Sequence, residues 1–144
     1  SIANTLIGQS LYSRRFSILG KRESISRERS VDGYKCDFFI HDTKTLIEVK
    51  SIISTKPVVG FPSIFSPRAI RQLKVLKQYI ESGKPVCYII VSLNPYTRSI
   101  FVDKTTPFYT IFKECLSLGM TVLGISCQIV DEQLSIRKML KVIT

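Results

Sequence analysis

The fold of this chain is decided by one stretch, Leu46-Ile47-Glu48-Val49-Lys50-Ser51-Ile52-Ile53. It is rich in aliphatic and β-branched residues, as is typical of a strand buried inside a sheet. Two charged residues, Glu48 and Lys50, interrupt the apolar run. Because side chains alternate along a strand, these two lie on one face, while Ile47 and Val49 point to the other. Charged groups on such a strand need a partner or a purpose.

A partner strand is predicted just before it, over Tyr34-Lys35-Cys36-Asp37-Phe38-Phe39-Ile40. The residues between the two strands, His41-Asp42-Thr43-Lys44, have turn chemistry. A hairpin that is symmetric about this turn sets Asp37 directly opposite Glu48. Two carboxylates at that distance repel each other unless a cation lies between them or one takes up a proton.

The rest of the chain supplies helices and further strands. We expect a short helix over 4–12, a loose strand within 24–29, and a loop through Pro57, Gly60 and Pro62. A helix should follow at about 67–82, capped by Ser66 and ended by Gly83. Beyond it we predict a strand over 86–91, an irregular piece around 94–95, a helix over 107–118, a strand over 121–130 and a last strand near 134–138. This order predicts an α/β fold, a mixed central β-sheet flanked by helices.

Composition narrows the class of protein. The 144 residues correspond to a single domain, and the 44% hydrophobic content is that of a globular protein. The 21 Lys and Arg residues outnumber the 11 Asp and Glu residues, which gives a net charge of +10. Such an excess favours a polyanionic partner, and nucleic acid is the usual one. No apolar run is long enough to span a membrane, so no membrane partner is expected.

The cysteines bear on the cellular compartment of the protein and give no sign of a metal site. The four cysteines, Cys36, Cys87, Cys115 and Cys127, are scattered singly, and the chain has one histidine, His41. A structural zinc site is therefore not expected, and buried free thiols are. Free thiols suit a reducing compartment, which predicts a cytoplasmic location.

The hairpin residues suit a metal-dependent reaction on phosphate. Asp37 and Glu48 are hard oxygen ligands of the kind that hold Mg²⁺ or Mn²⁺. A lysine alongside, Lys50, can orient the attacking water or neutralise charge that develops in the transition state. The alternative is a cross-strand charge pair on a solvated strand face, and residue chemistry alone leaves both interpretations open.

A resemblance strengthens the first interpretation. The array Asp37-(ten residues)-Glu48-Val49-Lys50 resembles the core of restriction-endonuclease-like PD-(D/E)xK nucleases. In order along the chain, the sequence further resembles the nuclease-like C-terminal domain of the SfsA family, the sugar fermentation stimulation proteins. The stretches that carry this likeness are Ala3-Asn4-Thr5-Leu6-Ile7, Cys36-Asp37-Phe38-Phe39-Ile40, Ile47-Glu48-Val49-Lys50-Ser51, Phe61-Pro62, Arg68 and Gly119-Met120-Thr121-Val122-Leu123.

The resemblance implies a DNA-binding, metal-dependent nuclease with Asp37 and Glu48 as metal ligands and Lys50 as the catalytic lysine. Glu23 falls where related folds often supply another ligand. The resemblance also implies that residues 1–144 form one nuclease-like domain without the N-terminal OB-fold-like domain of the family. The chain departs from the family pattern at Ser63, where an acid usually follows Phe-Pro, and at Arg68-Ala69-Ile70-Arg71-Gln72-Leu73.

The long helix carries a basic face. Arg68, Arg71 and Lys74 fall within one sector of the helix and are predicted to contact phosphates. Gln72 could support the site, as a polar group on this helix does in some related nucleases. No base-reading element is recognisable, so binding should be directed to the nucleic-acid backbone.

Two hypotheses remain. The first is a metal-dependent nuclease acting on DNA or RNA, and the second is a DNA-binding or transcription accessory domain with little chemistry. The intact Asp37, Glu48 and Lys50 favour the first, whereas Ser63 favours the second. The sequence leaves open whether the chain forms a homodimer.

Overall fold

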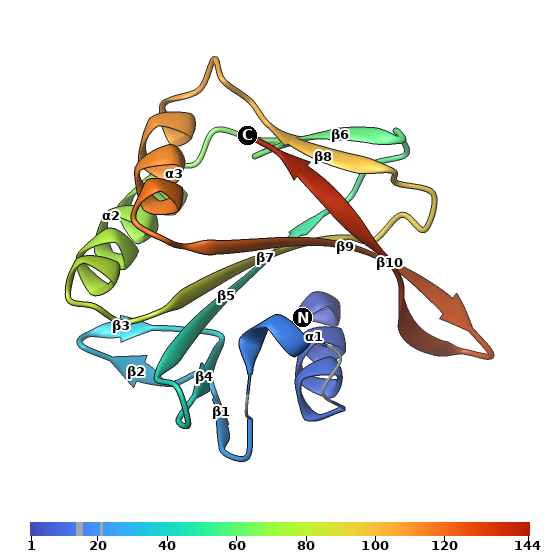
Figure 1. The fold of residues 1–144 in the computed structure, drawn as a ribbon. Helices are drawn as coiled ribbons and strands as arrows, with labels where there is room; N and C mark the ends of the chain where they lie inside the picture. The colour runs from blue at the N-terminus through green and yellow to red at the C-terminus, as the bar shows by residue number, and fades with distance from the viewer. Residues whose placement is uncertain (14–15, 21) are drawn as a thin grey trace.

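The strand that carries Glu48 and Lys50 lies inside a large mixed sheet. The computed structural model describes residues 1–13, 16–20 and 22–144, and among these the strands form an eight-stranded sheet and a two-stranded ribbon (Figure 1). The order across the sheet is β1 (Ile25–Arg27), β4 (Phe38–Ile40), β5 (Thr45–Ile52), β7 (Val86–Ser92), β9 (Thr121–Val130), β10 (Gln133–Ile143), β8 (Ser99–Val102) and β6 (Val58–Phe61). The ribbon consists of β2 (Ser30–Val31) and β3 (Tyr34–Lys35).

Parallel and antiparallel pairs both occur in this sheet. β5, β7 and β9 run parallel to one another, while β1, β4 and β5 form antiparallel pairs. β10 pairs antiparallel with β9 and parallel with β8, and β8 pairs parallel with β6. The predicted α/β fold with a mixed central sheet is therefore confirmed.

Helices cover both faces of the sheet. The α2 helix (Pro67–Glu81) and the α3 helix (Pro107–Ser117) pack side by side on one face, and α1 (Ile2–Tyr12) covers the other (Figure 1). A short 3₁₀ helix, Ser17–Leu19, follows α1. Side chains of β5 and β7 that face α2 and α3 are Leu46, Ile52, Val86, Tyr88 and Ile90. Those that face α1 are Ile47, Val49, Cys87, Ile89 and Val91. The predicted alternation along β5 thus places Glu48 and Lys50 on the face that α2 and α3 cover.

The end signals of α2 act as expected. The Ser66 hydroxyl accepts a hydrogen bond from the Ala69 N–H, and Pro67 occupies the first turn. Gly83 follows the helix with a φ of 90°, a conformation that glycine adopts without strain. Leu73, Leu76, Tyr79 and Ile80 are buried against the sheet. The first turn of α2 is therefore fixed beside β5.

Several strands differ from the sequence-based prediction. β6 forms within the predicted loop, and β8 forms at Ser99–Val102, where no element was predicted. These short strands pair with each other, and β8 also pairs with β10, which is distant in the sequence. β10 extends to Ile143, well past the predicted end near residue 138. The strand predicted over 34–40 is broken at Cys36 and Asp37 into β3 and β4.

The four cysteines are buried and free, as predicted. Within the described part of the chain, no helix has the length and apolar character needed to cross a membrane.

Tyr88 gives a test of the packing beneath the site. It is fully buried, lies opposite Glu48 in the pairing of β5 with β7, and makes edge contacts with the rings of Phe61 and Phe112. Its hydroxyl makes no hydrogen bond with any described residue, and burial raises its pKa well above the usual value.

We predict that Tyr88→Phe raises the free energy of unfolding by about 1 kcal/mol, because it removes an unpaired buried hydroxyl and keeps the ring contacts. Urea denaturation measures this change. A loss of stability of similar size would show that the hydroxyl has a partner, such as a buried water molecule.

Candidate active site

A polar cleft of about 490 Å³ opens where the hairpin, β5 and the first turns of α1 and α2 meet. Its charged lining comprises three acids, Glu28, Asp37 and Glu48, and three cations, Lys35, Lys50 and Arg68. Uncharged residues complete it: Ser1, Asn4, Cys36, Val49, Ser66, Ala69 and Gln72. The cleft therefore gathers the predicted hairpin residues together with residues from both helices.

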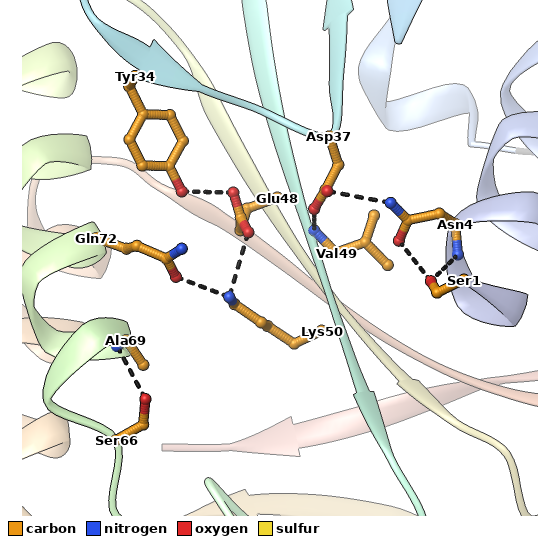
Figure 2. Close-up of polar contacts among 10 residues, drawn as sticks. All are labelled: Ser1, Asn4, Tyr34, Asp37, Glu48, Val49, Lys50, Ser66, Ala69 and Gln72. Atoms are coloured by element: carbon orange, nitrogen blue, oxygen red, sulfur yellow. Dashed lines mark hydrogen bonds and ion pairs between the residues drawn. The ribbon is translucent and has the colours of Figure 1, made fainter. Parts of the chain in front are cut away.

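Asp37 is fixed between β5 and α1. β4 and β5 pair in the predicted register, with Phe38 opposite Ile47, but Asp37 stands just before β4 and leaves the regular ladder. Its Oδ2 accepts a hydrogen bond from the Val49 N–H at 2.7 Å, and its Oδ1 accepts one from Asn4 Nδ2 at 3.1 Å (Figure 2). The Asp37 carboxylate thus accepts the Val49 N–H in place of a backbone carbonyl, and its bond to Asn4 holds α1 against the hairpin.

Glu48 is buried, with 5% of its surface exposed. Its Oε2 accepts a hydrogen bond of 2.5 Å from the Tyr34 hydroxyl, and its Oε1 lies 3.3 Å from Lys50 Nζ (Figure 2). Burial raises the pKa of the Glu48 carboxyl and the nearby Asp37 charge raises it further, although the contacts with Tyr34 and Lys50 act in the opposite direction. Ionised Glu48 is therefore costly here, and a cation beside it would offset that cost.

Lys50 bridges the strand and the helix. Its ammonium group donates to Gln72 Oε1 at 2.7 Å in addition to pairing with Glu48. Gln72 lies on the second turn of α2, which Ser66 starts beside the cleft (Figure 2). The structure therefore brings Gln72, a supporting residue in the sequence prediction, into direct contact with the candidate catalytic lysine.

Other predicted residues lie elsewhere. Glu23 precedes β1 rather than lying on a helix, and its N–H donates to Asp42 Oδ1 at the turn end of the hairpin. β1 pairs with β4 so that Glu23 is at the opposite end from Asp37, and it does not line the cleft. The structure does not bring Glu23 to Asp37 and Glu48.

Of the basic helix residues, Arg68 lines the cleft. Arg71 and Lys74 are exposed along α2 and lie outside the lining. The segment 14–29, another basic stretch, includes Arg14, Arg15 and Lys21, which lie outside the described residues.

Four residues of the site were missed by sequence reasoning. Glu28 and Lys35 line the cleft, and the Glu28 N–H donates to the Asp37 carbonyl because the pairing of β1 with β4 continues past Arg27. Asn4 and Tyr34 each hold a carboxylate. Extending the strand at 24–29 antiparallel to the hairpin could have found Glu28. Sequence carries no signal for the contact of Tyr34 with Glu48.

The donor set suits a hard divalent cation held by few protein ligands. Within residues 1–13, 16–20 and 22–144, no group of three or more His, Cys, Asp or Glu side chains is placed to hold a metal. Glu48 of β5 and Asp37, which directly precedes β4, supply carboxylate oxygens to the cleft. Mg²⁺ is commonly bound through one or two carboxylates, with water and substrate phosphate as its other ligands. Two carboxylates in an open cleft fit that pattern.

The family model described as sugar fermentation stimulation protein RE domain matches residues 1–133. The chain belongs to the SfsA family. Asp37, Glu48 and Lys50 all lie inside the matched range.

A solved structure agrees with this assignment. The SfsA of Pyrococcus furiosus in complex with Ca²⁺ superposes with a TM-score of 0.80 at 18% sequence identity. The match covers 96% of this chain and 62% of that protein, so the chain spans about three-fifths of its SfsA relative. At this identity the likeness shows a shared SfsA fold. Among curated proteins, none matches the sequence.

The buried carboxylate predicts an unusual gain of stability. We expect Glu48→Gln to raise the melting temperature by a few degrees in metal-free buffer, because a neutral amide removes the cost of an ionised group in a desolvated position. Glu28→Gln is the matched control, since Glu28 is an exposed acid in the same cleft and should change the melting temperature little. A marked drop for Glu48→Gln would instead show that its ion pair with Lys50 is net stabilising.

Proposed function

We propose that this domain is a divalent-metal-dependent nuclease that hydrolyses phosphodiester bonds of DNA or RNA. The observation that carries the proposal is the juxtaposition of Asp37, Glu48 and Lys50 in one polar cleft, with Glu48 buried and its carboxylate next to the lysine ammonium. The net charge of +10 supports a polyanionic substrate. Membership of the SfsA family supports the nuclease-like fold.

The proposed cofactor is Mg²⁺ or Mn²⁺, held by Asp37 and Glu48. When bound, such an ion polarises a phosphoryl oxygen and lowers the pKa of a coordinated water molecule. The Pyrococcus protein was solved with Ca²⁺, a cation that also prefers oxygen ligands. That finding supports a divalent ion for this chain without deciding which one.

The chain's own residues have separate roles in the proposal. Lys50 Nζ, next to Glu48, would orient the attacking water or stabilise negative charge that develops on the phosphate. Gln72 positions Lys50, while Tyr34 and Asn4 position Glu48 and Asp37 through the hydrogen bonds described above. Such supporting contacts commonly change metal affinity or activity by about 10- to 100-fold when removed.

Nucleic acid is the proposed partner, contacted through phosphates along α2. Arg68 lines the cleft, and Arg71 and Lys74 continue the exposed basic face away from it. Contacts of this kind give little sequence specificity. The four free thiols support action in a reducing compartment, and we propose the cytoplasm.

The competing function is a nucleic-acid-binding or transcription accessory domain. One observation favours it: Ser63 stands where the family pattern has an acid, and Ser63 does not line the cleft. Tyr34 and Lys50 contact the two Glu48 oxygens, and these contacts do not depend on a metal. A cleavage assay distinguishes the two proposed functions, because both predict binding of nucleic acid and only the nuclease predicts its hydrolysis.

The nuclease proposal predicts coupled metal binding and cleavage. Mn²⁺ or Mg²⁺ should raise the melting temperature of the wild-type chain and support cleavage of a labelled oligonucleotide, with no cleavage in EDTA. Glu48→Gln should lose both effects. Wild-type binding of nucleic acid without cleavage in either metal would favour the accessory domain.

Lys50→Ala separates chemistry from binding. We expect kcat to fall by about 100-fold or more with little change in oligonucleotide affinity, because the ammonium acts mainly in the transition state. Single-turnover kinetics measures both quantities. If affinity falls in step and the rate per bound complex is unchanged, Lys50 is a phosphate contact.

The basic helix can be tested by salt dependence. Replacing Arg68, Arg71 and Lys74 together by Ala should flatten the slope of log K against log salt on duplex DNA by roughly 2 to 3 units, at about 0.9 per lost phosphate contact. Arg68→Ala should be the single change with the largest effect on cleavage, because Arg68 alone of the three lines the cleft. An unchanged slope would assign this helix face to solvent.

A further inference from the structure

A second basic surface lies at the end of β5, beyond the cleft. Three segments meet here: the connection that follows β5, the connection that follows β7, and the middle of β10. The first two are joined because the backbone N–H groups of Arg98 and Ser99 both donate to the Pro57 carbonyl. Two hollows of about 390 and 730 Å³ share Thr55 and Tyr96. We call the exposed cationic and aromatic residues that border them the Tyr96 surface. These residues are Lys56, Tyr96, Arg98, Arg137 and Lys138.

The charge of the Tyr96 surface has one sign. Lys56, Arg98, Arg137 and Lys138 are all exposed, and within the described part of the chain no Asp or Glu lines either hollow. This differs from the hollow between α2 and α3, where Lys77 and Lys113 alternate with Glu81 and Glu114. A surface with four uncompensated cations is complementary to a polyanion.

Tyr96 adds an aromatic platform. Its side chain is 74% exposed, although large aromatic residues are usually more buried. The Arg137 guanidinium lies 5.7 Å from the ring centroid and is itself fixed, because Nη1 donates to the Pro95 carbonyl at 2.7 Å. The ring is therefore held by a cation and remains largely open to solvent.

An irregularity in β10 places Arg137 and Lys138 side by side on one hollow. Consecutive residues of a regular strand point to opposite faces, yet Arg137 and Lys138 line the same hollow. The pairing of β10 with β9 shifts between Ile136 and Lys138, which leaves Arg137 as the extra residue of a bulge. Bulges of this kind re-aim side chains.

The Tyr96 surface lies close to the cleft along the chain, just past the end of β5. Lys50 lines the cleft and Ile53 lines the larger hollow. These two residues are three positions apart in an extended segment, so their backbones are about 10 Å apart at roughly 3.3 Å per residue. A nucleic-acid strand bound in the cleft would therefore need to extend only a short distance past the end of β5 to reach this surface.

We propose that the Tyr96 surface binds a single-stranded stretch of nucleic acid, with a base stacked on Tyr96 and phosphates paired with the surrounding cations. The inference rests on the proposed nuclease function, because it assigns that site a substrate with a single-stranded segment. A base can lie on a tyrosine ring only after it leaves the duplex stack, and aromatic rings beside basic grooves are how single strands are held without sequence preference.

The test is binding of a fluorescent oligothymidylate by anisotropy, in EDTA so that nothing is cleaved. Tyr96→Ala should weaken binding by about 5-fold or more, since stacking contributes that much per base. Tyr96→Phe keeps the ring and should bind like wild type. Tyr12→Ala is the matched control, because Tyr12 is also an exposed tyrosine, at 60%, but borders neither hollow.

Charge is tested separately from stacking. Arg98→Ala combined with Lys138→Ala should flatten the slope of log K against log salt by about 1.4 units, at about 0.7 per single-strand phosphate. The control removes the same charge at Lys104 and Lys113, which border neither hollow, and should leave the slope unchanged.

The outcomes separate this inference from the proposed function. If wild type cleaves with Mg²⁺ but the Tyr96 surface variants bind oligothymidylate like wild type, the inference is overturned and the nuclease proposal stands. If those variants lose binding while wild type never cleaves, the inference stands and the nuclease proposal fails. Loss of binding to anionic lipid vesicles or to an acidic peptide, with oligothymidylate binding unchanged, would also overturn the inference.

Discussion

The buried Glu48 carboxyl group in the interior of a sheet is the constraint on which the rest of the site depends. A buried charge must be met by donors, and no single neighbouring element supplies them all. Tyr34 comes from the β2–β3 ribbon, and Lys50 from β5 is held in turn by Gln72 of α2. Satisfying one carboxylate thus joins the ribbon, the central strand and the long helix around one cleft.

Asp37 makes the corresponding connection on the other side. Because it accepts from Val49 of β5 and Asn4 of α1, it couples the first helix to the hairpin while keeping its carboxylate in the cleft. The Asp37 backbone stays bonded to both neighbouring segments, since its N–H donates to the Ile47 carbonyl and its carbonyl accepts from the Glu28 N–H. Both carboxylates are therefore preorganised by neutral or cationic donors, an arrangement suited to a site that exchanges these contacts for a metal ion.

Local patterns in the sequence were sufficient for the hairpin register, the ends of α2 and the placement of Glu48 and Lys50 on one face, because turn chemistry, capping and alternation act over a few residues. They were insufficient where distant segments pair. β6 and β8 are short and pair with segments distant in the sequence, so the prolines and asparagine near them resembled loops. The contact of Tyr34 with Glu48 depends on where the β2–β3 ribbon packs, and the Tyr96 surface forms where two connections meet a bulge in β10.

The central claim is that Asp37 and Glu48 together hold a divalent metal beside Lys50. Its most direct test is the anomalous diffraction of crystals grown with Mn²⁺, recorded for wild type and for Glu48→Gln. The account predicts an anomalous peak between the Asp37 and Glu48 carboxylates in wild type and none in the variant. A cleft without a peak in wild type at saturating Mn²⁺, or a peak that persists in Glu48→Gln, would contradict it.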